Sequence, residues 1–229
     1  MTETIQFTVD DDGIATLTID LPGESMNVIN EQFQKEAAEL IDKVLTDDAI
    51  KGAIITTGKK DFMAGADLRM LGGLMASKES LGAKGLYERA SRLNRLLRRM
   101  ETGGHSAKAL SKGQAHAKPF VAAIKGMALG GGFEIALGCH HRVCTSTAKF
   151  GLPEVKVGLL PGGGGTQRLP RIVGMQVALQ YASTGNNIDA STAEMLKLVA
   201  AVVPEEQLLT AAKKIITDNP KAVAPWDKK

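Results

Sequence analysis

Apolar and polar residues alternate at the start of the chain as they do in a β-hairpin. The runs Ile5–Val9 and Ile14–Ile19 flank an acidic turn at residues 10–13, a pattern typical of two antiparallel strands. After Asn30, apolar residues recur at helical spacing, so Asn30 is predicted to cap a helix. The buried stripe of that helix would contain Phe33, Ala37, Leu40, Ile41, Val44 and Leu45.

The middle of the chain continues with short β-type runs and one further helical stripe. Strands are predicted at residues 53–57, Phe120–Ile124 and residues 141–145. The helical stripe consists of Leu86, Ala90, Leu93, Leu97 and Met100, with Arg89, Arg92, Arg95 and Arg99 on its other, solvated faces. Residues 102–118 are rich in Gly, Ser, Lys and His without periodicity, which predicts a mobile loop.

The last third of the chain is mainly helical in pattern. Helices are expected at residues 175–182, 190–196 and 205–217, after a glycine run at residues 162–165. Strand and helix patterns alternate through most of the sequence, which favours a layered α/β fold with a largely parallel sheet. We expect one compact domain spanning residues 1–229.

Composition narrows the class of protein. The chain has 229 residues, 44% hydrophobic and 23% charged, as an ordinary globular protein has. Its net charge of +3 is too small to argue for nucleic acid but would suit a ligand with several phosphates. Two cysteines, Cys139 and Cys144, do not suggest a disulfide framework. With no signal pattern and no membrane-spanning apolar run, we expect a cytoplasmic protein.

The glycine run at residues 130–132 carries the first candidate chemistry. It opens an apolar helical segment that contains Glu134, and a second glutamate, Glu154, follows a proline twenty residues later. A helix start made of glycine exposes backbone N–H groups to a ligand oxygen. Glu134 lies one turn beyond Gly131, on roughly the same face. An anion-stabilising N–H beside two carboxylates is equipment for moving protons around an enolate.

A second glycine turn, Ala64-Gly-Ala66-Asp67, follows the strand predicted at residues 53–57. It could be only a tight turn in which Asp67 caps a helix. Alternatively, the N–H of Ala66 is a second donor that faces the N–H of Gly131, and the two bind the oxygen of a thioester as it becomes an enolate.

Two other clusters invite weaker interpretations. The glycines at residues 162–165 are not a phosphate-binding loop, because Thr-Gln-Arg follows instead of Lys-Ser/Thr. Cys139, His140, His141 and Cys144 are too crowded for paired zinc ligands, so we expect buried structural residues and no metal.

Four segments, residues 62–67, 125–134, 150–154 and 158–169, together resemble the enoyl-CoA hydratase/isomerase (crotonase) superfamily. The resemblance runs from about Ile5 to about Asn219. It implies a crotonase (ClpP-like) spiral of repeated ββα units and an acyl-CoA thioester held in an oxyanion hole. By motif position the oxyanion donors are the N–H groups of Ala66 and Gly131, and the glycines at residues 162–165 line the acyl site. Residues expected to contact the CoA part of this substrate are Ala64, Asp67, Leu68 and Arg69, with Arg69 placed to meet its phosphates.

The resemblance also implies an activity. Both glutamate positions of the hydratases are filled, so we expect hydration of 2-trans-enoyl-CoA in fatty-acid β-oxidation, with Glu134 activating water and Glu154 protonating C2. Δ3–Δ2 enoyl-CoA isomerisation and a non-catalytic acyl-CoA-binding or assembly module are the alternatives. No cofactor is expected besides the acyl-CoA substrate.

The end of the sequence and residues 171–176 resemble the hydratase part of multifunctional fatty-acid-oxidation alpha subunits. In those proteins a 3-hydroxyacyl-CoA dehydrogenase follows. Expected partners are therefore copies of the chain, or dehydrogenase and thiolase components of a β-oxidation complex. Two features depart from the family: residues 102–118 form a longer connection than usual, and the helices that close the acyl pocket are not found before Lys229. Acyl-chain length and oligomeric state therefore stay open.

Overall fold

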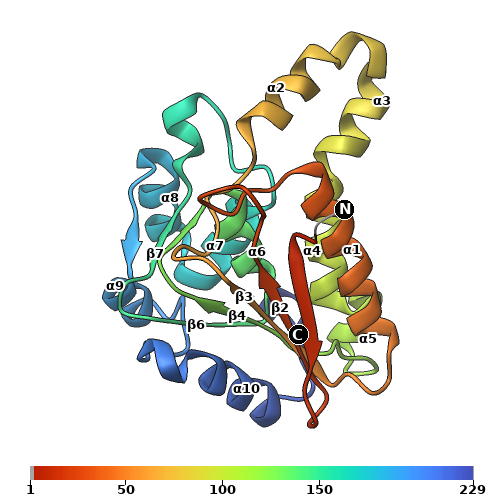
Figure 1. Cartoon of the computed structure of the whole chain (residues 1–229), viewed down its shortest axis with the longest axis vertical. Coiled ribbons are helices and arrows are strands. Elements are labelled where there is room, and N and C mark those ends of the chain that lie inside the picture. The colour runs from red at the N-terminus through yellow and green to blue at the C-terminus, as the bar shows by residue number, and fades with distance from the viewer. Residues whose placement is uncertain (1–2, 229) are drawn as a thin grey trace.

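A computed structural model describes residues 3–228 of the chain, and within this range the strands form two sheets. The larger sheet has the order β1-β2-β3-β4-β6 (Figure 1). Its members are β1 (Ile5–Val9), β2 (Ile14–Ile19), β3 (Gly52–Thr57), β4 (Phe120–Ile124) and β6 (His141–Cys144). The first two strands pair antiparallel and the others parallel. The predicted hairpin and the largely parallel sheet are both confirmed.

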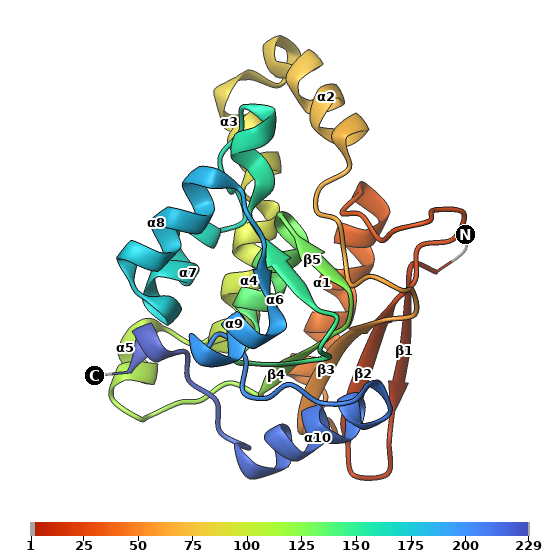
Figure 2. The same cartoon turned by 90° about the vertical axis from the view of Figure 1, so that its left-hand side faces the viewer.

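Helices cover both faces of this sheet. On one face, Ile54, Val121 and Ala123 pack with residues of α10 (Leu208–Asp218), seen below the sheet in Figure 2. On the other face, the alternate residues Ile55 and Ala122 join the larger core. Such two-sided burial explains why the central strand β4 is apolar at every position.

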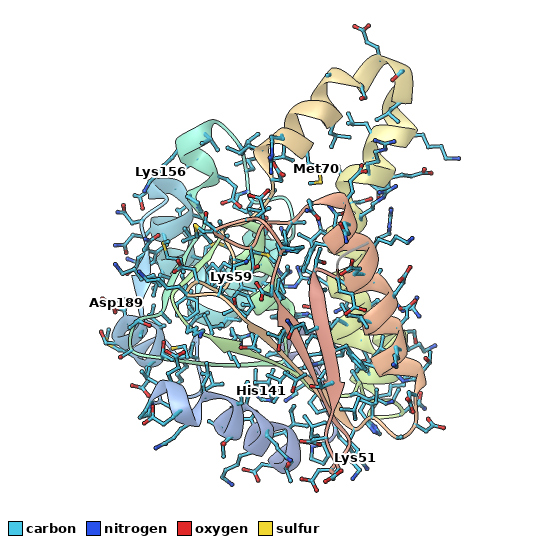
Figure 3. All side chains as sticks on the ribbon, in the orientation of Figure 1. Lys51, Lys59, Met70, His141, Lys156 and Asp189 are labelled. Carbon is cyan, nitrogen blue, oxygen red and sulfur yellow. The ribbon has the colours of Figure 1, made fainter. Side chains whose placement is uncertain are left out.

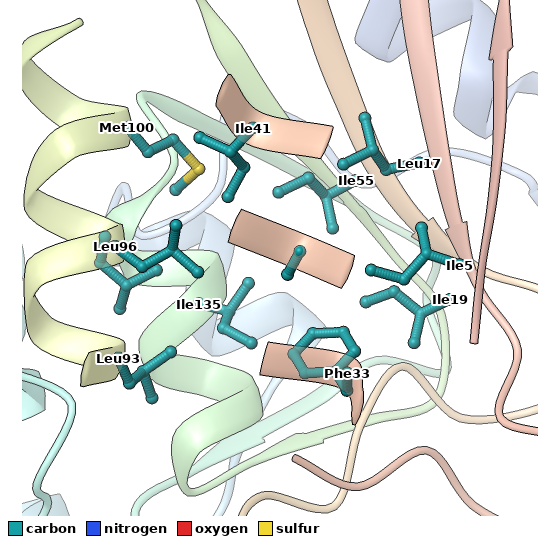
Figure 4. A pocket seen from close by; sticks show the side chains of 12 residues that line it. Ile5, Leu17, Ile19, Phe33, Ile41, Ile55, Leu93, Leu96, Met100 and Ile135 are labelled. Atoms are coloured by element: carbon teal, nitrogen blue, oxygen red, sulfur yellow. The ribbon is translucent and has the colours of Figure 1, made fainter. Parts of the chain in front are cut away.

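The larger core lies between the sheet and three helices: α1 (Glu31–Thr46), α4 (Arg92–Thr102) and α6 (Gly131–Gly138). Asn30 caps α1 as predicted, since its side chain accepts a hydrogen bond from the N–H of Phe33 at 2.8 Å. Figure 4 shows an apolar crevice in this core. Among its lining side chains are Ile5, Leu17, Phe33, Leu93, Leu96 and Ile135.

The smaller sheet positions the candidate site. It consists of β5 (Met127–Leu129), β7 (Lys149–Gly151) and β8 (Ile188–Asp189), in the order β5-β7-β8. The parallel strands β5 and β7 lead, respectively, into α6 and into the 3-10 helix η1 (Pro153–Val157). The two segments that carry the candidate glutamates therefore leave one sheet edge side by side.

Helices α2 (Leu68–Ala76) and α3 (Lys78–Ala90) project from the body of the molecule (Figures 1 and 2). The prediction of one continuous stripe from Leu86 to Met100 is wrong. Ser91 separates α3 from α4, and Ala90 is exposed, so only the α4 part of the stripe is buried in the core. The four arginines predicted to be solvated are exposed.

The segment 102–118 is not the continuous loop that its composition predicted. It contains the short helix α5 (Ala107–Ser111), because the Ser106 side chain accepts a hydrogen bond from the N–H of Ala109. One turn capped in this way is too short to produce a periodic pattern.

The predicted C-terminal helices are present, with slightly different ends: α8 (Met175–Thr184), α9 (Ala190–Met195), and η2 (Glu205–Gln207) followed by α10. The sequence interpretation missed α7 (Gly165–Val173), which begins at the last glycine of the run 162–165, and the 3-10 turn η3 (Pro225–Asp227). Charged side chains such as Lys51, Lys156 and Asp189 lie at the periphery (Figure 3). No helix within residues 3–228 is long and apolar enough to span a membrane.

Candidate active site

Two backbone N–H groups, those of Ala66 and Gly131, lie close together without a hydrogen-bond acceptor in the described part of the chain. The N–H of Ile29 donates to the carbonyl of Gly65 at 2.8 Å, and the N–H of Asp67 donates to the carbonyl of Ile29 at 3.0 Å. Successive peptides of an extended segment point to opposite sides. The N–H of Ala66 therefore points away from Ile29.

That N–H faces the start of α6. A Cβ atom built on Gly131 would lie 3.8 Å from the nitrogen of Ala66, and one built on Gly65 would lie 3.3 Å from the nitrogen of Gly131. Gly131 is the first residue of α6, so its N–H has no carbonyl one turn earlier within the helix. Two convergent, unoccupied donors at a helix N-terminus can bind an oxyanion.

Glycine is required at two successive positions on the α6 side of this hole. Gly130 has φ 51° and ψ −130°, a conformation that residues with a Cβ rarely adopt. At Gly131 a Cβ would meet Ile29 Cδ1 at 2.6 Å. The backbone of β5 consequently turns into α6 with no side chain between the donors and a ligand.

Glu134 lies one turn into α6 and is only 2% exposed. The N–H of Gly163 donates to its Oε2 atom and the N–H of Gly165 donates to its Oε1 atom, both at 2.7 Å. Burial raises the pKa of the Glu134 carboxyl, while these N–H groups and the charge of Arg168 oppose the shift. The result is a carboxylate fixed in orientation at both oxygens.

Glu154 occupies a different environment in η1. It is partly buried, and a Cβ atom on Gly130 would lie 3.2 Å from its Oε1 atom. Its Oε2 atom is buried and has no hydrogen-bond partner among residues 3–228. Burial, with a further contribution from the charge of Glu134, raises the pKa of Glu154 to about 7. A carboxyl group with this pKa is protonated for part of the time at neutral pH, as a proton donor must be.

The glycine run 162–165 has a function that its sequence interpretation did not include. Beyond lining the site, two of its N–H groups hold Glu134. A Cβ on Gly163 would collide with a Glu134 oxygen and lie 2.8 Å from Leu93 Cδ2. The sequence signal that could have indicated this contact is the run itself, four glycines directly before a helix.

The residues predicted to contact CoA lie around the start of α2. Asp67 Oδ1 accepts the N–H of Arg69 at 2.8 Å, as a helix cap does, while the N–H of Ala66 stays free, so its role as an oxyanion donor stays a prediction. The Arg69 guanidinium is exposed and pairs with Asp67 and Glu24, both at 2.9 Å. Leu68 is exposed, and the N–H of Ala64 donates to the Asn27 carbonyl at 2.9 Å. Their contact with CoA stays a prediction.

The cysteine and histidine cluster has structural contacts. The Nδ1 atom of His140 accepts the N–H of Phe120 at 3.1 Å, so the ring proton is on Nε2, which donates to the carbonyl of Glu101 at 3.1 Å. Burial lowers the pKa of His140 to about 4. Cys139 and Cys144 are free thiols and buried. Across the described residues, no group of three or more His, Cys, Asp or Glu side chains is arranged to hold a metal ion.

This geometry can be compared with known proteins. Residues 88–224 match the family described as enoyl-CoA hydratase/isomerase. The chain belongs to the enoyl-CoA hydratase/isomerase family. Its predicted resemblance to that family is therefore confirmed.

Curated relatives of this family member are longer proteins. It is 42% identical over 225 residues to the fatty acid oxidation complex subunit alpha of Idiomarina loihiensis, covering 95% of this chain and 28% of the relative. It is 43% identical to the protein of the same name from Shewanella frigidimarina, covering 98% and 29%. The chain therefore spans less than a third of the length of these relatives.

Solved structures confirm the predicted crotonase fold. An enoyl-CoA hydratase from Bacillus anthracis superposes with a TM-score of 0.78 at 26% identity, covering 94% of this chain and 76% of that one. DspI from Pseudomonas aeruginosa gives a TM-score of 0.75 at 30% identity, covering 95% and 80%.

Proposed function

We propose that this chain hydrates 2-trans-enoyl-CoA thioesters to 3-hydroxyacyl-CoA. The observation that carries the proposal is the placement of two free N–H groups, from Ala66 and Gly131, beside two carboxyl groups in unlike environments. When two carboxyl groups lie in different environments, one can act as the general base and the other as the general acid.

Each group has a defined task in this reaction. The thioester oxygen accepts hydrogen bonds from the N–H groups of Ala66 and Gly131, which stabilise the negative charge of the enolate. Glu134, ionised and held at both oxygens, takes a proton from water as the water oxygen bonds to C3 of the substrate. The electron pair of the C2–C3 double bond moves into the enolate. Glu154, kept partly protonated at neutral pH, then delivers a proton to C2.

The substrate and partners follow from this assignment. The substrate is an acyl-CoA with a double bond next to the thioester, and the reaction needs neither metal nor nucleotide cofactor. Ala64, Asp67, Leu68 and Arg69 contact the CoA moiety, where Arg69 exchanges an exposed ion pair for a phosphate contact. The printed name of the relatives, fatty acid oxidation complex subunit alpha, supports a place in such a complex. Dehydrogenase and thiolase components are the partners that we propose there. Free, buried cysteines suit the reducing cytoplasm.

A spectroscopic assay tests the proposal. Purified protein is mixed with crotonyl-CoA, and the absorbance of the conjugated thioester is followed without added metal or nucleotide. We expect the absorbance to decay to the hydration equilibrium and 3-hydroxybutyryl-CoA to form. The matched control is the double variant Glu134→Gln/Glu154→Gln, which keeps the shape of both side chains. Unchanged absorbance with folded wild-type protein that binds acyl-CoA would instead support a binding module, and conversion of only a 3-enoyl-CoA would support an isomerase.

A further inference from the structure

A buried ion pair lies directly behind the glycine run that holds Glu134. Arg168 on α7 and Glu101 on α4 are 7% and 2% exposed. The Nε atom of Arg168 donates to Glu101 Oε1 at 2.6 Å, and its Nη2 atom donates to Oε2 at 3.2 Å. Two parallel hydrogen bonds of this kind fix the plane of the guanidinium as well as its position.

The remaining terminal nitrogen of this guanidinium faces the glycine run. Nη1 of Arg168 donates to the carbonyl of Gly163 at 2.8 Å. The N–H of the same glycine donates to Glu134 Oε2 at 2.7 Å. Gly163 is thus held by the arginine on one side and holds the glutamate on the other.

Glu101 is itself anchored from the surface. Arg98 on the preceding turn contacts its Oε2 atom at 3.3 Å and pairs with both oxygens of Asp227, each at 2.6 Å. Asp227 is buried in η3, near the end of the described chain. A continuous series of contacts therefore runs from Asp227 through Glu101 to the carboxylate of Glu134.

We propose that Arg168 is a positioning residue for Glu134, which it places through Gly163, and that Glu101 and Arg98 keep Arg168 in its orientation. This inference rests on the proposed hydratase function. In this role Arg168 acts on Glu134 through Gly163 and does not touch the substrate. Its planar group joins α4, α7 and the glycine run, and no single-point donor such as lysine has the geometry to do all three.

The charges around Glu134 allow this positioning role to be distinguished from simple structural support. Arg168 of α7 and Glu154 of η1 face Glu134. Glu101 and Arg98 of α4 lie behind the Arg168 side chain. Strand β5 brings no titratable side chain. Arg168 is the cation among these groups that stabilises the ionised form of Glu134 against burial. Loss of the Arg168 cation should therefore raise the pKa of Glu134. The acidic limb of the pH profile of kcat/KM should then move to higher pH.

Two variants and one control separate charge from geometry. Arg168→Lys keeps the positive charge but loses the fork, and the double variant Glu101→Gln/Arg168→Met removes both buried charges together, so that neither is left unpaired. Arg171→Met is the control, because Arg171 is exposed on the same helix and, within residues 3–228, its side chain bonds only Gln167.

We expect Arg168→Lys to lower kcat about 10- to 100-fold, as a small misplacement of a reacting group does, with KM within about twofold and an unmoved acid limb. The double variant should lower kcat similarly and shift the acid limb to higher pH, while the control stays at the wild-type rate. Wild-type kcat in Arg168→Lys, or an unmoved acid limb in the folded double variant, would overturn the inference.

A measurement independent of turnover separates this inference from the proposed function. In protein labelled with ¹³C at the glutamate carboxyl carbons, the Glu134 resonance is assigned by its disappearance in Glu134→Gln. Its titration should shift to higher pH in the double variant and stay in place in Arg171→Met. If the wild-type chain does not hydrate crotonyl-CoA, the proposed function fails. The inference is then tested by this titration, and it fails if the titration is the same in wild type and double variant.

Discussion

A Cβ atom on Gly130 would lie 3.2 Å from the Oε1 atom of Glu154. Gly130 also has φ 51°, outside the range that side chains favour. We therefore expect Gly130→Ala to lower the rate of hydration at least about tenfold, because it displaces an acid–base group from its working position. The measurement is kcat for crotonyl-CoA, together with the free energy of unfolding in urea.

Gly174→Ala is the matched control for this substitution. Gly174 also has a positive φ, 86°. Apart from its two chain neighbours, however, no atom of the described residues lies within 4 Å of the position that a Cβ would take. Both variants should lose about 1–3 kcal/mol of stability from backbone strain, and only Gly130→Ala should lose activity. Equal rates in the two variants would show that the space beside Glu154 is not used.

Conversion of either candidate glutamate to glutamine tests the acid–base roles. An amide keeps the size of the side chain but does not exchange a proton at neutral pH. Glu134→Gln and Glu154→Gln should each lower kcat by roughly 100- to 10,000-fold, with acyl-CoA binding nearly unchanged in calorimetry. A variant that turns over at close to the wild-type rate would remove its glutamate from the mechanism.

The sequence predicted those parts of the fold that produce a local pattern. The hairpin follows from alternation, and the cap at Asn30 follows from an acceptor placed just before an apolar helical stripe. The break at Ser91 was not predictable in this way. The apolar stripe continues through this position, although the helix ends at Ala90 and a new helix begins at Arg92. Helix α7 was missed for a different reason: it opens with glycine and carries Pro170 in its interior, and proline opposes a helix interior.

The candidate site was predictable as a set of residues but not as a network. Glycines and glutamates in linked motifs identified Ala66, Gly131, Glu134 and Glu154, and the structure brings their segments together. The contact of Arg168 with Glu101 joins positions 67 residues apart. Neither residue has a local signal, because an arginine in a helix is usually solvated. Their role follows from the packing of α4 and α7 against α6, which brings the two side chains together.

The raised pKa of Glu154 predicts a pH-dependent gain in stability for Glu154→Gln. The pKa of Glu154 in the folded protein is about 7, whereas its ordinary value is 4.5. The protonated form is thus favoured in the folded protein, so its stabilising contribution is complete below pH 4.5 and is lost as pH rises through 7. Above pH 7 the amide should increase the free energy of unfolding by about 1–2 kcal/mol, less than the full shift implies because the carboxyl is partly solvated.

Urea titrations of both proteins at pH 4.5 and pH 8 check this prediction. The difference between Glu154→Gln and wild type should be near zero at the lower pH and positive at the higher one. Each comparison is made at a single pH, so the titration of other groups cancels. A glutamine variant that is no more stable than wild type at pH 8 would contradict the assignment of a raised pKa to this residue.

Gly131 provides a test of the oxyanion hole that separates its N–H from its small size. Gly131→Pro removes the N–H, but any Cβ here meets Ile29 Cδ1 at 2.6 Å. Gly131→Ala, which has the same collision and keeps the N–H, is therefore the necessary control. With the Ile29→Ala substitution added to both to relieve the contact, the proline variant should be at least about 100-fold slower than the alanine variant.

Melting temperatures and acyl-CoA affinity are measured alongside the rates. Proline is tolerated at the first position of a helix, so both double variants should fold. If the proline and alanine variants hydrate crotonyl-CoA at the same rate, Gly131 does not donate to the thioester oxygen.

Asn27 is fully buried, and no pattern in the sequence indicates its contacts. Its side-chain oxygen accepts the N–H of Leu21 at 3.0 Å. Its amide nitrogen donates to the carbonyls of Ile19 and Phe62, at 3.0 and 3.1 Å, and also contacts Thr57 Oγ1 at 2.9 Å. Asn27 thereby joins the ends of β2 and β3 to the segment that leads to Ala66.

Asn27→Ala should lower the free energy of unfolding by about 3 kcal/mol, because it leaves several buried polar groups without partners. Asn219→Ala is the matched control, since Asn219 is exposed and, in the described part of the chain, its side-chain amide donates only to the carbonyl of Ile215. The free energy of unfolding of this variant should stay within about 0.5 kcal/mol of the wild-type value. Because Asn27 supports the backbone before Ala66, the folded fraction of Asn27→Ala should also have a reduced kcat. Stability equal to that of the control would mean that water replaces these hydrogen bonds without cost, and the segment before Ala66 would then need another support.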